Sequence, residues 1–71
     1  MVVHTLNSTY TFVDKGDGAF EMTSTNERYA GPQLVSFLRP PSAGSGLFIK
    51  APTPTRPHRV IITSEVLSIQ P

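Results

Sequence analysis

The sequence lacks several residues on which catalytic and metal-binding chemistry depends. Its 71 residues include no cysteine and no tryptophan, and only 15% of them are charged. Without cysteine there is no disulfide, no thiol nucleophile and no cysteine-ligated zinc or iron–sulfur site. Because small secreted scaffolds are usually held together by disulfides, this absence favours a reducing compartment, and we expect a cytoplasmic protein.

Long hydrophobic runs are also missing. The longest aliphatic run is Val60-Ile61-Ile62, whereas a membrane-spanning helix needs about 20 apolar residues. The first residues have neither the basic start nor the apolar stretch of a signal peptide. We therefore expect no membrane association.

Proline and glycine divide the chain into short pieces. The 7 prolines and 5 glycines leave too little room for an amphipathic helix but enough for strands. Alternating β-branched and aromatic residues predict a hairpin over residues 9–24, closed by a turn over 14–18. Further strands are expected over residues 2–6, at an edge, and over 33–38 and 47–51. Residues 58–63 and 65–69 are expected to form either one bent strand or two short ones around Ser64.

The connections carry their own expectations. Residues 52–57, which contain three prolines, are predicted to form a stiff, extended segment with polyproline character. Tyr29 is the large apolar group of a polar loop, and we expect it to fold back as a lid on the core.

Five or six short strands separated by turns indicate an all-β fold made of one small domain, residues 1–71. We predict a small antiparallel, partly open barrel of the SH3-like or OB-like kind, because closure removes exposed strand edges. The closing segment TSEVLSI, residues 63–69, resembles the last strand of small bacterial and phage barrels, and this resemblance brings no functional residue. The expected core comprises Val3, Tyr10, Phe12, Phe20, Met22, Leu34 or Val35, Phe37, Phe48 or Ile49, Val60, Ile62, Val66 and Ile69.

Catalytic and metal-binding patterns are absent. His4 and His58 lie far apart in the sequence, and no acidic residue is spaced to orient either one as a base. Asp14 and Asp17 share a turn, but glycines occupy the alternate positions where a calcium loop needs oxygen ligands. We expect no enzymatic activity, no metal and no cofactor.

One motif in the proline-rich segment has two interpretations. Pro54-Thr55-Arg56-Pro57-His58-Arg59 fits the P-x-x-P-x-R form of ligands of SH3 domains. A stiff loop between two strands needs the same residues. The sequence leaves both interpretations open.

Charge is distributed unevenly along the chain. Residues 1–27 carry one lysine against four acidic residues, a net charge of −3, whereas residues 28–64 carry five basic residues and no acidic one. We expect a basic partner-binding surface formed by four cations with an aromatic anchor. Its members are Arg39, Lys50, Arg56 and Arg59, with Tyr29 or Phe48 as the anchor.

Two functions are compatible with this surface. The first is a non-enzymatic protein-binding module: an adaptor, an inhibitor or a structural component that packs with copies of itself. The alternative is a small barrel that binds single-stranded nucleic acid, with its cations on phosphates and Tyr29, Phe37 or Phe48 stacked on bases. The sequence pI of about 8.2 lies below the range above 9 that is typical of nucleic-acid-binding domains, which favours the first function. A solvated basic surface without a partner remains a third interpretation.

Overall fold

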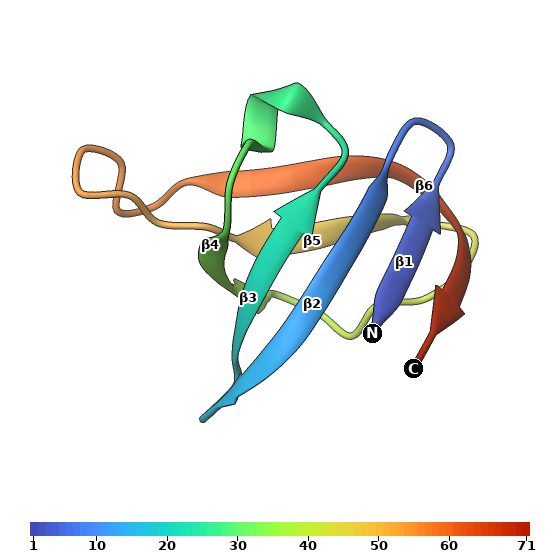
Figure 1. Ribbon diagram of the computed structural model, residues 1–71, viewed down its shortest axis with the longest axis horizontal. Coiled ribbons are helices and arrows are strands. Elements are labelled where there is room, and N and C mark those ends of the chain that lie inside the picture. The colour runs from blue at the N-terminus through green and yellow to red at the C-terminus, as the bar shows by residue number, and fades with distance from the viewer.

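The computed structural model describes all residues, 1–71, and shows a ring of six antiparallel strands (Figure 1). Each strand pairs with the next, and the last returns to pair with the first, so the barrel is closed. The predicted small antiparallel barrel is confirmed. The barrel is closed, however, not partly open, and the first strand pairs on both sides instead of lying at an edge. The elements are β1 (Val2–Thr5), β2 (Thr9–Gly16), β3 (Ala19–Ser24), the short 3-10 helix η1 (Glu27–Tyr29), β4 (Gln33–Phe37), β5 (Gly46–Lys50) and β6 (Val60–Gln70).

The hairpin predicted over residues 9–24 is formed by β2 and β3. Its tight turn places Asp17 at φ 55° and Gly18 at φ 78°, the left-handed conformation that two-residue hairpin turns require. The Asp14 carboxylate accepts a hydrogen bond from the Gly16 N–H at 2.7 Å. Aspartate and glycine therefore shape this turn, as their order in the sequence suggested.

The core fills the inside of the ring. The rings of Phe20 and Phe37, which are partly buried, pack against buried Phe12, with centroids 4.8 Å apart for Phe12 and Phe37. Where the sequence left pairs open, Val35 is buried rather than Leu34, and Ile49 rather than Phe48. The ten buried apolar residues are Val3, Tyr10, Phe12, Met22, Val35, Leu47, Ile49, Ala51, Ile61 and Val66.

The core prediction is wrong for the start of β6. Val60 and Ile62 are 46% and 62% exposed, whereas Ile61 between them is 3% exposed. The reason is strand register: Ile61 lies opposite the inward-facing Ile49 of β5, and cross-strand partners point to the same side of a sheet. The alternation of β5 also buries two residues that were not expected in the core, Leu47 and Ala51.

β6 is one long, bent strand that serves two neighbours. Its register shifts once against β5 and once against β1, as at a β-bulge, and such bulges bend a strand. Near the first shift β5 and β6 approach closely, and a Cβ atom on Gly46 would overlap the Thr63 carbonyl oxygen. The Thr63 hydroxyl accepts a hydrogen bond from the Leu47 N–H at 2.9 Å. Glycine at position 46 therefore permits the bend that closes the ring.

The segment 52–57 is not extended, so the polyproline prediction is wrong. Thr53 and Arg56 exchange backbone hydrogen bonds of 3.0 and 3.1 Å, which fold the chain back on itself. The Thr53 hydroxyl also accepts from the Arg56 N–H at 3.0 Å. This local bond stabilises a turn over the solvated extended form. In the structure Pro54 and Pro57 are therefore not held in the straight polyproline helix of an SH3 ligand.

Candidate functional site

The outward side chains of β4, β5 and β6 form rows across three strands. Lys50 lies opposite Ser36 on one side and Val60 on the other, and Phe48 lies opposite Ile62. The Leu38 N–H donates to the Phe48 carbonyl at 2.9 Å, which brings Leu38 into the second row. We call this surface the β4–β6 face; it consists of Leu34, Ser36, Leu38, Phe48, Lys50, Val60 and Ile62.

This face is largely apolar and open to solvent. Leu34, Leu38 and Ile62 are each more than half exposed, and Val60 is 46% exposed. Single exposed apolar residues are common on soluble proteins, but a contiguous group of them marks an interaction surface. Leu38 and Ile62 lie in the row of Phe48, and Val60 lies in the adjacent row of Lys50. These exposed residues therefore form one surface.

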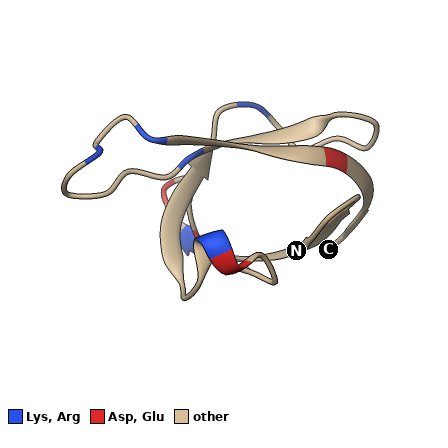
Figure 2. Cartoon of the chain, turned by 90° about the horizontal axis from the view of Figure 1, so that it is seen from above, with Lys and Arg blue, Asp and Glu red and all other residues tan.

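Basic residues accompany the apolar ones. Lys50 lies within the face, and the Arg39 guanidinium lies over the Phe48 ring, 4.0 Å from its centroid. Figure 2 shows basic segments, in blue, on the β4–β5 and β5–β6 connections and no acidic segment on either. The face is therefore apolar at its centre and carries Arg39 and Lys50 on the side of β5, while Glu21 of β3 lies opposite Leu34 at its other margin.

A second group covers one end of the barrel. Tyr29, at the end of η1, packs against the core, which confirms the predicted lid. The Arg59 guanidinium lies over the Tyr29 ring, 5.6 Å from its centroid. Its Nη1 donates to Gln33 Oε1 at 2.9 Å and to the Ala51 carbonyl at 3.5 Å. One arginine thus joins the β5–β6 connection to residues 29–33, which are distant from it in the sequence.

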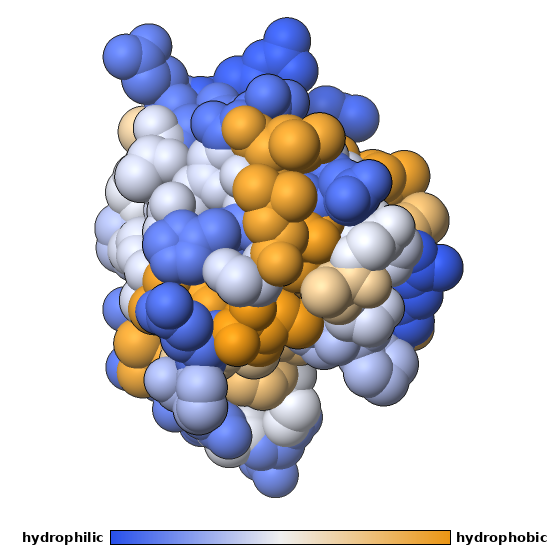
Figure 3. All heavy atoms as spheres, turned by 90° about the vertical axis from the view of Figure 1, so that its right-hand side faces the viewer, coloured by the Kyte–Doolittle hydropathy of each residue, from blue (hydrophilic) through white to orange (hydrophobic).

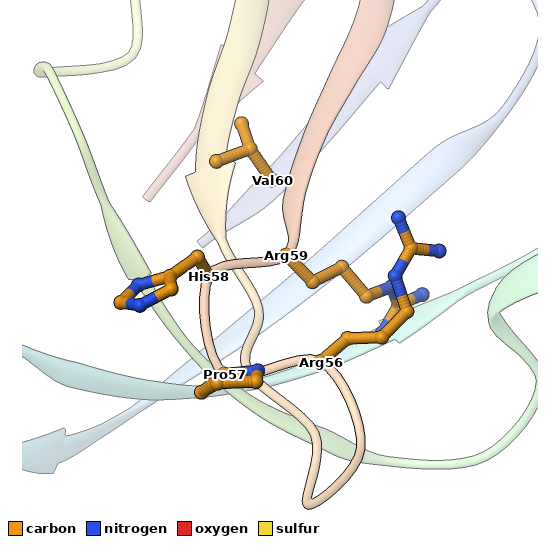
Figure 4. A pocket seen from close by; sticks show the side chains of 5 residues that line it. All are labelled: Arg56, Pro57, His58, Arg59 and Val60. Carbon is orange, nitrogen blue, oxygen red and sulfur yellow. The ribbon is translucent and has the colours of Figure 1, made fainter.

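The β5–β6 connection holds a shallow depression of about 270 Å³. In Figure 4 the side chains of Arg56 and Arg59 extend to the same side, and the His58 imidazole points to the opposite side. The other histidine, His4, contacts Thr9 on β2, with Nδ1 3.1 Å from Oγ1. The structure therefore keeps the two histidines apart. The depression is lined by Arg56, Pro57, His58, Arg59 and Val60.

The predicted surface residues are arranged as two arginine–aromatic pairs. Arg39 pairs with Phe48 and Arg59 pairs with Tyr29, while Lys50 lies on the face and Arg56 on the connection. The sequence analysis missed the apolar part of the face. One signal was present: a charged Lys50 must point outward, which also turns Phe48 outward on the same strand. The missed residues are Leu34, Leu38, Val60 and Ile62.

A separate apolar strip lies on the side of the barrel where β1 meets β6 (Figure 3). Leu6 is 63% exposed and Leu67 is 54% exposed, and the Leu6 N–H donates to the Glu65 carbonyl at 3.1 Å. Leu67 has the same exposed fraction as Leu38 of the β4–β6 face. It therefore provides a matched control for substitutions on that face.

Comparison with known proteins leaves the site to be interpreted from its own geometry. No family model, no curated protein and no solved structure matches the chain. The structure contains no helix long and apolar enough to cross a membrane. It also contains no group of three or more histidine, cysteine, aspartate or glutamate residues placed to hold a metal ion.

Proposed function

We propose that this barrel is a protein-binding module whose β4–β6 face docks an acidic, apolar segment of a partner protein. The observation that carries the proposal is the exposure of Leu38 and Ile62, which lie in one row on either side of the half-buried Phe48. The barrel core is complete without them. Their exposure is therefore not a requirement of folding, and burial against a partner would remove this apolar surface from water.

The partner's charge follows from the residues around the row. Lys50 and Arg39 flank the apolar side chains, and residues 28–64 contain no acidic residue. An acidic segment would complement this potential and would accelerate association at low salt. A second basic segment would be repelled.

The closed ring limits how the partner binds. A peptide that adds a strand needs a free sheet edge, and here every strand is paired on both sides. Docking on this surface therefore uses side-chain contacts rather than backbone pairing. An amphipathic helix, with apolar residues on one side and carboxylates beside them, suits such a surface.

The structure also bears on the nucleic-acid alternative. Single-strand binding by small barrels depends on aromatic faces that are free to stack on bases. The Phe48 ring carries Arg39 and the Tyr29 ring carries Arg59, so a base would have to displace an arginine from one of them. This arrangement favours the protein partner.

The proposal is tested by selecting binders from a displayed library of random peptides and measuring their affinity by calorimetry. We expect enriched peptides to combine acidic and large apolar residues. The double variant L38S/I62S should weaken their binding at least about tenfold, because it removes two apolar side chains that the peptide would bury in the complex. The double variant L6S/L67S changes equally exposed leucines on the β1–β6 strip and should leave the affinity unchanged.

Three outcomes would contradict the proposal. The first is selected peptides that bind L38S/I62S as well as the parent chain. The second is tighter binding of a mixed single-stranded oligonucleotide, lost in the same variant, which would assign the face to nucleic acid. The third is self-association measured by light scattering and lost in L38S/I62S, which would make a second copy the occupant.

A further inference from the structure

Arg59 is a charged residue that is partly buried without a counter-ion. Among the lysines and arginines it alone is half-buried, and both of its side-chain hydrogen bonds go to neutral oxygens, of Gln33 and Ala51. Removing a charge from water is unfavourable unless an opposite charge compensates it. An anion at this position would therefore bind to a cation that is already partly desolvated.

The guanidinium also retains unused donors. It has five N–H groups in a planar fork, and both hydrogen bonds formed within the chain come from Nη1. The Nε and Nη2 groups remain to donate side by side. Such a pair matches two oxygens of a carboxylate or phosphate group.

Arg56 supplies a second positive charge on the same side of the connection (Figure 4). The backbone is fixed by the turn between Thr53 and Arg56, by the Arg59 N–H donating to the Arg56 carbonyl at 3.2 Å, and by the Ala51 N–H donating to the Arg59 carbonyl at 2.9 Å. The backbone that carries both arginines is thus fixed before any ligand arrives, and the Arg59 side chain is held by Gln33 and Ala51. A preorganised site of this kind loses little entropy on binding.

We infer that Arg56 and Arg59 form an oxyanion-binding site at the β5–β6 connection, which takes a phosphate or carboxylate group. His58 belongs to the lining of the depression, but its ring points away from the two arginines, so it is not part of the site. The site adds to the proposed docking face and does not depend on it. Its test uses the isolated chain, so the two proposals fail separately.

The experiment follows the arginine Nε–Hε signals of the ¹⁵N-labelled chain by NMR during titration with sodium phosphate and, separately, sodium acetate. Sodium chloride at equal ionic strength is the reference. We expect the Arg56 and Arg59 signals to shift together and to saturate with one dissociation constant. Saturation by phosphate alone would assign the site to phosphate groups, and saturation by acetate would extend it to carboxylates.

Variants identify the groups that bind. Arg59→Gln should weaken binding at least about tenfold, the loss expected for a hydrogen bond to a charged group. Arg56→Gln should also weaken binding. It changes an exposed side chain that does not contact Tyr29, so it tests the site without disturbing the packing of that ring on the core. Arg28→Gln, beside Tyr29 in η1, is the control and should bind as the parent does.

The inference is overturned by shifts that grow linearly and match those in sodium chloride, because these would report ionic strength alone. Equal weakening by Arg28→Gln would also overturn it. The amide spectrum of each variant shows whether the fold is retained.

Discussion

The outer surfaces of the two halves of the barrel differ sharply, although both enclose the same core. Across β1, β2 and β3 the outward positions include Thr11, opposite Thr23, and His4, whose ring contacts Thr9. On the β4–β6 face the outward positions are mostly leucine, isoleucine, valine and phenylalanine. The first half shows that this fold tolerates a polar exterior, so the apolar exterior of the second half calls for an explanation other than folding.

The connections repeat this difference. The β2–β3 turn contains Asp14 and Asp17, whereas the β5–β6 connection contains Arg56 and Arg59. Charge and hydropathy therefore change together between the halves. The exposed apolar residues outside the second half, Leu6 and Val13, are not accompanied by a group of arginines.

The largest expected effect tests the register that creates the β4–β6 face. Ile61→Ala should destabilise the barrel by about 2–5 kcal/mol, because it leaves a cavity in the core. Ile62→Ala, one residue further along, should change the free energy of unfolding by less than about 0.5 kcal/mol, because its side chain is exposed. Urea denaturation of both variants measures the difference. A larger loss for Ile62→Ala than for Ile61→Ala would mean that β6 is shifted by one residue and that Ile62 belongs to the core, not to the face.

A smaller effect is expected where β6 bends. Gly46→Ala should cost about 1–3 kcal/mol, because the added methyl group would force β5 away from the Thr63 carbonyl. Thermal unfolding followed by circular dichroism measures this loss. The control is Ser45→Ala, which adds no atom beside β6 and removes only the exposed hydroxyl contact with Ser42 at 3.3 Å. A Gly46→Ala variant as stable as the parent would show that the two strands are further apart than described.

The smallest effect concerns the charged rim of the face. Arg39→Gln should reduce stability by about 0.5–1 kcal/mol, the contribution of an exposed cation–π contact. Arg56→Gln, which removes an equal charge from a residue without an aromatic partner, should have less effect in the same denaturation experiment. If the two variants behave alike, the Arg39–Phe48 contact contributes nothing beyond charge.

The sequence predicted the barrel because its strand signals are local. Alternation over β2 and β3 and the aspartate–glycine turn are readable within a few neighbouring residues. The orientation of Val60, Ile61 and Ile62 cannot be predicted locally, because three consecutive aliphatic residues show no alternation. Which of their side chains points into the core depends on the pairing of β6 with β5. The apolar face was hidden by this ambiguity.

The candidate cations were found because charge is visible in any sequence. Their partners were not, since Arg59 meets Gln33 and Tyr29 only after the ring has formed. The turn between Thr53 and Arg56 was missed because the prolines around it indicated extended structure. A threonine hydroxyl that bonds to the backbone decided the conformation instead.

The pairing of β1 with β6 has a consequence for how the protein forms during synthesis. Val2 lies opposite Gln70, so the ring joins the earliest-made strand to the last one. Ile61 and Val66, two of the buried side chains, also arrive with that final strand. Until β6 leaves the ribosome, one edge of β1 has no strand partner and the hydrophobic core is incomplete. Completion of this barrel is therefore expected only after β6 has emerged from the ribosome, in a single late step.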